Sequence, residues 1–194
     1  MYCVNHRRRT DLRVITGIAR GRKLTTLEGI DVRPTADMVK EAMFSILQFE
    51  LEGARVVDLF CGSGQLGVEA LSRGAAYCTF VDSSRASQEV TRQNLQDTGL
   101  HKNSKVAALD AADFLRTTQG CFDIALLDPP YGKGLLNTVL PLLAPKMSPA
   151  GVILCESALT DDPPETAGEF VLQKSYRYGK IKLSAYRRPV KDEE

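Results

Sequence analysis

Short apolar segments alternate with helical segments through most of this chain, and no other feature restricts its fold as much. Strands that are apolar, often β-branched and joined by helices form a parallel sheet that is covered on both faces. The ligands of such sheets bind beyond the carboxyl ends of the strands. The pattern therefore predicts an α/β, Rossmann-like fold. We expect strands at 55–60, 77–82, 106–109, 122–128 and 151–156, a final hairpin at 170–174 and 181–187, and helices at 66–73, 84–98, 111–117 and 135–143.

The start of the chain carries a different pattern. Its first residues are polar and read as a mobile leader, and alternating apolar and polar residues at 13–18 and 22–27 predict a small basic β-hairpin. A helix is expected to begin at Thr35 and to end at Glu52-Gly53, because threonine is a suitable N-cap and apolar residues follow at helical spacing. We therefore expect a leader and hairpin extension at 1–34 and the main domain at 35–194.

Basic residues gather at both ends of the chain, although the net charge is only +1. Residues 1–40 hold nine Lys or Arg against four acids, and residues 171–189 hold six against none. Such clusters are typical of surfaces that contact a polyanion, although a solvated surface gives the same composition. The candidate nucleic-acid contacts in the first cluster are Arg20, Arg22, Lys23 and Arg33.

The five cysteines do not form a ligand pattern. None lies in a Cys-x-x-Cys pair and no histidine lies near one at ligand spacing, which argues against a zinc site and a disulfide framework. No run of about 18 apolar residues is present to cross a membrane. The start of the chain lacks the apolar core of a secretory signal. We therefore expect a cytoplasmic protein that binds neither a metal nor a membrane.

A glycine-rich segment follows the first strand of the alternating region. Gly62, Gly64 and Gly67 stand in the order G-x-G-x-x-G, which permits a tight turn and lets a ligand approach the backbone at a helix N-terminus. Asp82 and Ser83 end the next strand, where a carboxylate can accept hydrogen bonds from ribose hydroxyls. This pattern fits a nicotinamide oxidoreductase, and a G-x-G-x-x-G run alone can also be a plain turn.

The residue types around the glycines favour a different cofactor. Asp58 lies inside the strand, where dehydrogenases usually have an apolar residue or glycine. S-adenosylmethionine carries an ammonium group and no diphosphate, so a carboxylate here would attract it and would repel a dinucleotide. Asp113 could accept a hydrogen bond from the adenine amino group, but Asp110 competes for this role and either can be a helix-terminus acid. The candidate cofactor residues are Asp58, Phe60, Cys61, Gly62, Ser63, Gly64, Asp82, Ser83, Asp113 and Asp128.

The segment Asp128-Pro129-Pro130-Tyr131 ends the fourth strand and predicts the chemistry. An exocyclic amino group on guanine or adenine is a poor nucleophile, because its lone pair is delocalised into the ring. The two prolines have no N–H, so this backbone offers carbonyl acceptors without a competing donor. The Asp128 carboxylate and the Pro129 carbonyl can each accept a hydrogen bond from one N–H group of the amino group. Tyr131 can stack on the base once the base has left its nucleic-acid stack. The segment predicts methylation of such an amino group and does not distinguish guanine from adenine.

Several segments together resemble the RsmD-type bacterial 16S ribosomal RNA guanine-N2 methyltransferases. The resemblance covers roughly residues 13–188. Its most specific part is the basic hairpin followed by R-P-T and a helix, because many methyltransferases share the glycine loop and D-P-P-Y. Met38 stands where the family often carries arginine. The segments are Arg22-Lys23-Leu24, Arg33-Pro34-Thr35, Glu41-Ala42-Met43-Phe44, Asp58-Leu59-Phe60-Cys61-Gly62-Ser63-Gly64, Glu69-Ala70-Leu71-Ser72-Arg73-Gly74 and Asp128-Pro129-Pro130-Tyr131.

The resemblance implies a class I methyltransferase domain at 35–194, with a seven-stranded, mostly parallel sheet and a small N-terminal β-hairpin. It implies methyl transfer from S-adenosylmethionine, with S-adenosylhomocysteine as product. The implied target is N2 of a guanine in 16S ribosomal RNA, guanine 966 in bacterial rRNA numbering. The implied substrate is the small ribosomal subunit or its assembly intermediate. We add Thr35 to the cofactor contacts and expect a monomer. Three alternatives stay open: an adenine-N6 methyltransferase of RNA or DNA, a Rossmann-type oxidoreductase, and a non-catalytic RNA-binding assembly factor.

Overall fold

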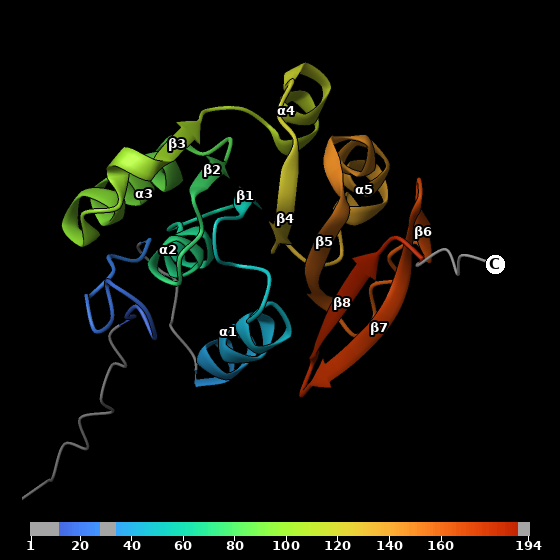
Figure 1. The fold of residues 1–194 in the computed structure, drawn as a ribbon. Helices are drawn as coiled ribbons and strands as arrows, with labels where there is room; N and C mark the ends of the chain where they lie inside the picture. The colour runs from blue at the N-terminus through green and yellow to red at the C-terminus, as the bar shows by residue number, and fades with distance from the viewer. Residues whose placement is uncertain (1–11, 28–33, 190–194) are drawn as a thin grey trace, which may run out of the picture.

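One eight-stranded sheet runs through the middle of the molecule (Figure 1). The computed structural model describes residues 12–27 and 34–189. The strands lie in the order β3-β2-β1-β4-β5-β8-β7-β6, of which the first five are parallel to one another and β8, β7 and β6 pair in antiparallel fashion. Their bounds are β1 Arg55–Leu59, β2 Tyr77–Val81, β3 Ser104–Ala107, β4 Phe122–Leu127, β5 Met147–Ala158, β6 Thr166–Ala167, β7 Phe170–Tyr178 and β8 Ile181–Arg187.

The sheet has one strand more than the seven expected, and the additional strand is β6. Its two residues, Thr166 and Ala167, pair with Val171 and Phe170 at the start of β7. A strand of two residues is too short to show alternation, so the sequence gives no sign of it. The α/β class and the mostly parallel sheet are confirmed.

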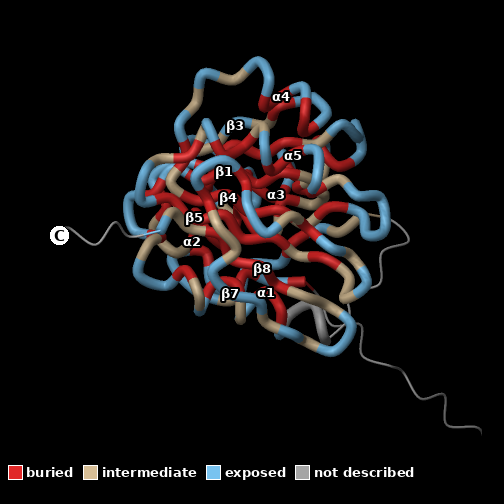
Figure 2. The backbone as a smooth tube through the Cα atoms, turned by 90° about the vertical axis from the view of Figure 1, so that its right-hand side faces the viewer, coloured by how far each residue is buried: buried red, intermediate tan, exposed pale blue. Residues whose placement is uncertain are grey.

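Helices cover both faces of the sheet, as expected for strands that are apolar on both sides. Helices α1, α2 and α3 pack in one buried cluster with residues such as Met43, Leu71 and Leu95. Helices α4 and α5 pack on the other face through Leu115 and Leu140. Figure 2 shows the buried residues concentrated in the sheet and on the inner sides of the helices. The bounds are α1 Pro34–Ile46, α2 Gln65–Ser72, α3 Arg85–Thr98, α4 Ala111–Thr117 and α5 Leu135–Leu143, with short 3-10 turns at His101–Asn103 and Ala144–Lys146.

Some elements end at other residues than expected. Helix α1 ends at Ile46 and is followed by hydrogen-bonded turns, whereas the sequence placed its end near Gly53. Strands β5 and β7 are longer than expected. In β5, Met147 pairs with Phe122 ahead of a register shift, and Ser157 and Ala158 pair with β8. In β7, Ser175 to Tyr178 pair with β8 although Ser175 and Arg177 are exposed. Pairing across a sheet therefore extends strands beyond their apolar cores.

The register of the parallel strands places the loops that carry the candidate residues side by side. Leu59, the last residue of β1, is level with Val81 of β2 and with Leu127 of β4. After Leu59 the backbone N–H of Cys61 still donates to the carbonyl of Val81 at 3.0 Å. The chain therefore leaves three neighbouring strands at the same edge of the sheet.

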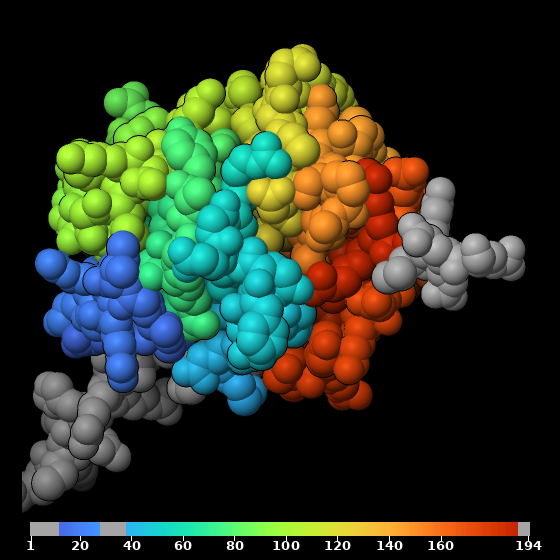
Figure 3. Space-filling view, in the orientation of Figure 1, coloured from blue at the N-terminus to red at the C-terminus, as the bar shows by residue number. Residues whose placement is uncertain are grey.

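Residues 12–27 form a small hairpin beside α2, which is the blue lobe in Figure 3. The two strands expected here are reduced to a single antiparallel bridge between Arg13 and Lys23. Two further backbone hydrogen bonds support the bridge, from Val14 to the Arg22 carbonyl at 3.0 Å and from Leu24 to the Leu12 carbonyl at 2.8 Å.

Polar residues of α2 hold this hairpin in place. The Glu69 carboxylate, which is 1% exposed, accepts hydrogen bonds from the backbone N–H groups of Ile15 at 2.8 Å and Thr16 at 3.0 Å. It also pairs with the Arg73 guanidinium at 2.7 Å. The Ser72 hydroxyl donates to the Thr16 carbonyl at 2.6 Å. Because a buried charge is costly without partners, the hairpin and α2 stabilise each other.

Candidate active site

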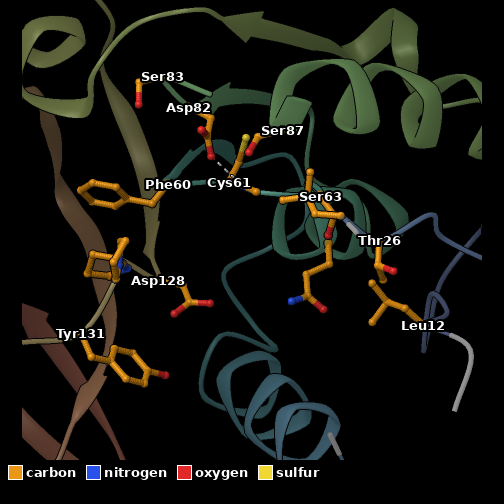
Figure 4. A pocket seen from close by; sticks show the side chains of 15 residues that line it. Leu12, Thr26, Phe60, Cys61, Ser63, Asp82, Ser83, Ser87, Asp128 and Tyr131 are labelled. Carbon is orange, nitrogen blue, oxygen red and sulfur yellow. Dashed lines mark hydrogen bonds between the residues drawn. The ribbon is translucent and has the colours of Figure 1, made fainter. Parts of the chain in front are cut away.

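A cavity of about 560 Å³ opens at the carboxyl edge of the sheet (Figure 4). Cavities of this size bind cofactors and other small molecules. The walls come from the loops after β1, β2 and β4, from the first turns of α2 and α3, and from the base of the N-terminal hairpin. The residues that line it are Leu12, Thr26, Leu27, Phe60, Cys61, Gly62, Ser63, Gln65, Asp82, Ser83, Ser87, Asp128, Pro129, Pro130 and Tyr131.

The glycine loop after β1 forms one wall of the cavity. Phe60, Gly62 and Gly64 have φ values of 66°, 55° and 76°, and Phe60 is the one described residue other than glycine with a positive φ. Such a backbone is strained for a residue with a side chain, and strain of this kind is commonly found at functional sites. Gly67 serves a different purpose, because a Cβ built there would lie 2.3 Å from the Phe80 ring. The third glycine of the motif therefore lets α2 pack closely on β2.

Asp82 fastens this loop to the end of β2. Its Oδ2 accepts a hydrogen bond from the Gly62 N–H at 2.9 Å, and its Oδ1 accepts one from the Ser84 N–H at 2.8 Å. A carboxylate has about four acceptor positions, so two remain for a ligand. The half-buried Asp82 side chain lines the cavity, where it can accept hydrogen bonds from hydroxyl groups.

Asp58 lies beneath the glycine loop and does not line the cavity. It is 1% exposed, and its Oδ2 accepts a hydrogen bond from the Gly67 N–H at 2.8 Å. Burial raises the pKa of Asp58 to about 7, the Gly67 hydrogen bond opposes this rise, and the charge of Asp82 adds to it. The side chain points toward the start of α2 and forms a structural bond between β1 and that helix, and its contact with a cofactor ammonium stays a prediction.

Two buried polar residues of α3 support the glycine loop from behind. The Thr91 hydroxyl donates to the Gly62 carbonyl at 2.9 Å, and the Asn94 amide donates to the Ser63 carbonyl at 2.8 Å. Neither side chain is exposed to solvent. The sequence analysis missed both residues, and the available signal was two small polar side chains three residues apart on one helix face.

Asn94 also joins the loop to the N-terminal hairpin. Its Oδ1 accepts a hydrogen bond from the Thr25 N–H at 2.8 Å, and its amide donates to the Thr25 carbonyl at 3.0 Å. The neighbouring Thr26 and Leu27 line the cavity together with Leu12. The base of the hairpin is therefore part of the cavity, a position that the sequence analysis did not foresee.

The facing wall is formed by Asp128-Pro129-Pro130-Tyr131 after β4. Asp128 is half-buried at the strand end, Pro129 is buried, and Pro130 and Tyr131 are exposed. In Figure 4 the side chains of Asp128 and Tyr131 lie on one side of the cavity, and Leu12 lies on the other. Neither proline can donate a hydrogen bond, so this backbone presents acceptors to whatever lies against it.

The charge of Asp128 depends on its surroundings. Burial, together with the charges of Glu156 and Asp58, raises the pKa of this carboxyl to about 8. Near neutral pH the carboxyl therefore holds a proton much of the time when no cation is nearby. A positively charged ligand in the cavity would favour the ionised form.

Tyr131 is held by a residue that the sequence analysis missed. The Tyr131 hydroxyl donates a hydrogen bond to the carboxylate of Glu156 on β5. Burial raises the pKa of Glu156, and this hydrogen bond opposes the rise. The next residue, Gly132, donates its N–H to the Asp161 carboxylate at 3.1 Å. Two carboxylates from the end of β5 and the segment after it thus fix the loop that follows the prolines.

The structure brings most of the candidate residues together at the cavity and places a few elsewhere. Gly64 lies behind the wall as the N-cap of α2. Asp113 is exposed in the first turn of α4 and does not line the cavity, because its carboxylate pairs along the helix with Arg116 at 2.7 Å. Asp110 is the N-cap of the same helix. Thr35 lies in α1, and its side chain is outside the described part of the structure.

The candidate RNA contacts lie on the N-terminal hairpin. Arg20, Arg22 and Lys23 are exposed there, and Arg33 lies outside the described residues. The tip of the hairpin packs on the last turn of α2, where the Ile18 N–H donates to the Ser72 carbonyl at 2.8 Å. The base of the hairpin borders the cavity, and its basic residues are exposed outside the cavity wall.

Other kinds of site find no support in the described ranges 12–27 and 34–189. No cluster of three or more His, Cys, Asp or Glu side chains there could hold a metal ion. None of the described helices combines the length and apolarity that crossing a membrane requires. Cys61, Cys78 and Cys155 are buried free thiols, and burial raises the pKa of each.

Comparison with known proteins gives relatives over nearly the whole chain. The family model described as conserved hypothetical protein 95 matches residues 12–187. The protein YlbH of Bacillus subtilis is 35% identical over 182 residues, which cover 91% of this chain and 99% of YlbH. Ribosomal RNA small subunit methyltransferase D of Escherichia coli is 32% identical over 191 residues, which cover 97% of this chain and 96% of that protein. The solved structure of Escherichia coli yhhF superposes with a TM-score of 0.81 and 34% identity, covering 92% of this chain and 98% of that chain.

Proposed function

The chain belongs to the RsmD-like family described as conserved hypothetical protein 95, and on this premise we propose that it is an S-adenosylmethionine-dependent methyltransferase of ribosomal RNA. Its relative in Escherichia coli is named as a methyltransferase of small-subunit ribosomal RNA. The finer proposal is that it methylates N2 of a guanine in 16S ribosomal RNA, within the small subunit or its assembly intermediate.

One observation carries this proposal: Asp128-Pro129-Pro130-Tyr131 and the glycine loop face each other across a single cavity. The glycine loop and Asp82 suit a nucleoside with a ribose, and the segment after β4 suits an amino group on a base. An oxidoreductase needs only the first of these two walls. An assembly factor without activity needs neither.

The cavity fits S-adenosylmethionine by its size and by its polar groups. Asp82 would accept hydrogen bonds from the ribose hydroxyls. The protein backbone of the loop from Phe60 to Ser63 would lie directly against the cofactor. Asp128 would favour a positive charge near it. When bound, the cofactor supplies an electrophilic methyl group on a sulfonium.

The residues after β4 would prepare the target nitrogen. The Asp128 carboxylate and the Pro129 carbonyl each accept a hydrogen bond from one N–H group of the amino group. These two hydrogen bonds localise the lone pair on the nitrogen. The nitrogen gains a methyl group and gives up one proton, and the ionised Asp128 carboxylate can take that proton. Most of the rate enhancement would come from holding the nitrogen in line with the methyl group.

Tyr131 would hold the base. Its ring is 43% exposed at the mouth of the cavity, and Glu156 fixes its hydroxyl. Enzymes that modify a base take it out of the stack and place it against aromatic rings. A fixed ring loses little conformational freedom when the base arrives.

The proposal is tested with small ribosomal subunits from a strain that lacks the corresponding gene. The subunits are incubated with methyl-labelled S-adenosylmethionine and the protein, and the labelled nucleoside is identified after digestion. N2-methylguanosine in 16S ribosomal RNA is the expected product, and N6-methyladenosine would establish the adenine-directed alternative. Free 16S ribosomal RNA in a parallel reaction shows whether the assembled subunit is required.

The matched control is Asp128→Ala. We expect its turnover to fall far more than its cofactor affinity, with a melting temperature near that of the wild type, because the contact strengthens in the transition state. Asp128→Asn should be less damaging, because the amide oxygen still accepts a hydrogen bond. If the folded Asp128→Ala protein turns over normally, Asp128 only closes the end of β4 and the proposed chemistry is wrong.

A further inference from the structure

The basic stretch 171–189 takes no part in the proposed site, and the structure divides its six cations into two groups. The members of the first group hold parts of the fold together, so they are not available to a partner without a structural cost. They act through the ion pairs Arg187–Glu50 at 2.6 Å and Arg188–Glu169 at 2.8 Å, and through a hydrogen bond from Lys182 to the Asp161 carbonyl at 2.6 Å.

The second group consists of Lys174, inside β7 and level with Ala185 of β8, and of Arg177 and Lys180 at the turn between β7 and β8. All three are exposed, and none forms an ion pair with a described carboxylate. The Lys174 ammonium lies 5.0 Å from the centre of the Tyr176 ring, and the Arg177 guanidinium donates to the Gly179 carbonyl at 3.3 Å. These contacts position Lys174 and Arg177 and leave their charge uncompensated.

The register of the sheet places this turn at the same edge as the cavity. Strand β8 is antiparallel to β5, with Leu183 opposite Glu156 and Ile181 opposite Ala158. Glu156 accepts the hydrogen bond of Tyr131, which lies in the loop after β4. The turn between β7 and β8 therefore begins just beyond the level of Glu156 in the sheet. Neighbouring strands lie about 4.8 Å apart, which puts β7 about 10 Å from β5. Figure 1 shows the turn at the lower end of the sheet, toward which β5 points.

The turn and the N-terminal hairpin lie on opposite flanks of the cavity. The hairpin contacts α2 and α3, through Glu69 and Asn94, beside β1 and β2. The sheet order places β8 and β7 on the far side of β4 and β5. A polyanion that reaches into the cavity would therefore meet basic residues on both sides of its entry point.

From these observations we propose that Lys174, Arg177 and Lys180 bind phosphates of the RNA that flanks the target base, so that the substrate lies across the cavity between two basic hairpins. This inference rests on the proposed function, because it takes the target to be RNA. Tyr176 and Tyr178 alternate with these cations and are half-buried, which keeps the hairpin rigid against the core. Rigid cations lose less entropy on binding a phosphate than mobile ones do.

A competing explanation is that the charges guard an edge strand. Strand β6 covers only the first two residues of β7, and charged residues on such an edge prevent pairing with other chains. The two explanations predict different results when the three charges are removed. Edge protection predicts association of the protein when they are removed, and phosphate binding predicts weaker RNA binding by a protein that stays monomeric.

The test replaces Lys174, Arg177 and Lys180 by glutamine and measures binding to purified 16S ribosomal RNA over a range of salt concentrations. We expect affinity at low salt to fall about tenfold to a hundredfold, and the slope of log affinity against log salt to fall by about 2, since each phosphate contact in single strands contributes about 0.7. Cofactor affinity and melting temperature should stay at the wild-type values. The matched control removes three exposed cations at a distance from the cavity, Arg92→Gln, Lys102→Gln and Lys105→Gln.

Suppose that the wild-type protein methylates the RNA and that the first triple variant binds it with unchanged affinity and unchanged salt slope. This result would overturn the inference and leave the proposed function standing. An equal loss in the control variant would overturn it as well, because any three charges would then serve. If the first triple variant associates with itself, RNA binding is measured on the single variant Lys180→Gln, because Lys180 lies outside the strands. Normal RNA binding by this single variant would assign the charges to edge protection. A wild-type protein that neither binds purified 16S ribosomal RNA nor methylates it, free or within small subunits, would instead overturn the proposed function, and this inference with it.

Discussion

The Tyr131 hydroxyl donates a hydrogen bond to the Glu156 carboxylate, and this contact joins the loop after β4 to the neighbouring strand β5. The same loop carries Asp128, whose pKa is raised first by burial and then by the charge of Glu156. Glu156 therefore affects both candidate catalytic side chains, one through a hydrogen bond and the other through its charge.

The first prediction concerns the Tyr131 ring. Tyr131→Phe keeps the ring and loses the hydrogen bond, so kcat/KM should fall less than tenfold. Tyr131→Ala should lose about 1–3 kcal/mol of stacking on the base. Methylation kinetics on small subunits measure both values, and calorimetry with S-adenosylmethionine serves as the control, since neither change should weaken cofactor binding. Equal kcat/KM values for the two variants would show that the ring does not hold the base.

The second prediction concerns pH. The pKa of Asp128 is about 8 in the protein alone, and the ionised carboxylate is the better acceptor for the amino group. Single-turnover methylation should therefore increase with pH, with an apparent pKa below 8, because the bound cationic cofactor favours the charged form. Asp128→Asn has no proton to lose at this position and should give a nearly flat profile. A wild-type rate that decreases with rising pH over the same range would contradict this assignment.

The third prediction compares two carboxylates that the sequence places in the same cofactor site. Asp82→Ala removes an acceptor from the cavity wall and a partner of the Gly62 N–H, so cofactor binding should weaken by about 1–3 kcal/mol. Asp113→Ala should leave the affinity unchanged, because Asp113 is exposed and pairs with Arg116 on α4. Calorimetry with S-adenosylmethionine measures both variants. A large loss for Asp113→Ala would show that α4 moves toward the cofactor on binding.

The fourth prediction concerns stability. The pKa of Asp58 is raised from an ordinary value of 3.8 to about 7, so between these pH values the folded protein keeps a proton that the unfolded chain has released. The stability due to this group is therefore full below about pH 4 and declines as the pH rises to about 7. Asp58→Asn removes this decline and can still accept the Gly67 hydrogen bond. The melting temperature of the variant relative to wild type should rise between pH 5 and pH 8, and a constant difference would contradict the buried, protonated state.

The sequence predicted the parts of this fold that depend on local pattern. Apolar runs that end in glycine or proline marked β1 and β4, and the loops after them carry most of the residues that line the cavity. The short strand β6 was missed because its pairing with β7 comes from proximity in space. Strand order, and with it the contact between Glu156 and Tyr131, depends on which strands become neighbours, and no local pattern encodes that.

The site expected from the sequence and the cavity in the structure differ in the directions of side chains. Asp58 and Asp113 follow or end strands in the sequence, as cofactor residues do, but one points beneath the loop and the other points along α4. Asn94 was missed because a single polar residue in a helix gives no sign of the two loops that it connects. Residue type and strand position indicated which loops matter, whereas packing decided which side chains of those loops reach the cavity.

The buried carboxylate of Glu69 has a consequence for any attempt to shorten this protein. Two of its partners are backbone N–H groups of residues 15 and 16, which precede the helical part of the chain. A truncated form that begins at α1 would leave this carboxylate with Arg73 and water, and it would also remove Leu12, Thr26 and Leu27 from the cavity. The hairpin and the sheet should therefore unfold in one cooperative transition. A shortened form that keeps the whole cavity must therefore retain residues 12–27, and this hairpin cannot be exchanged for that of another protein without redesigning the surface of α2.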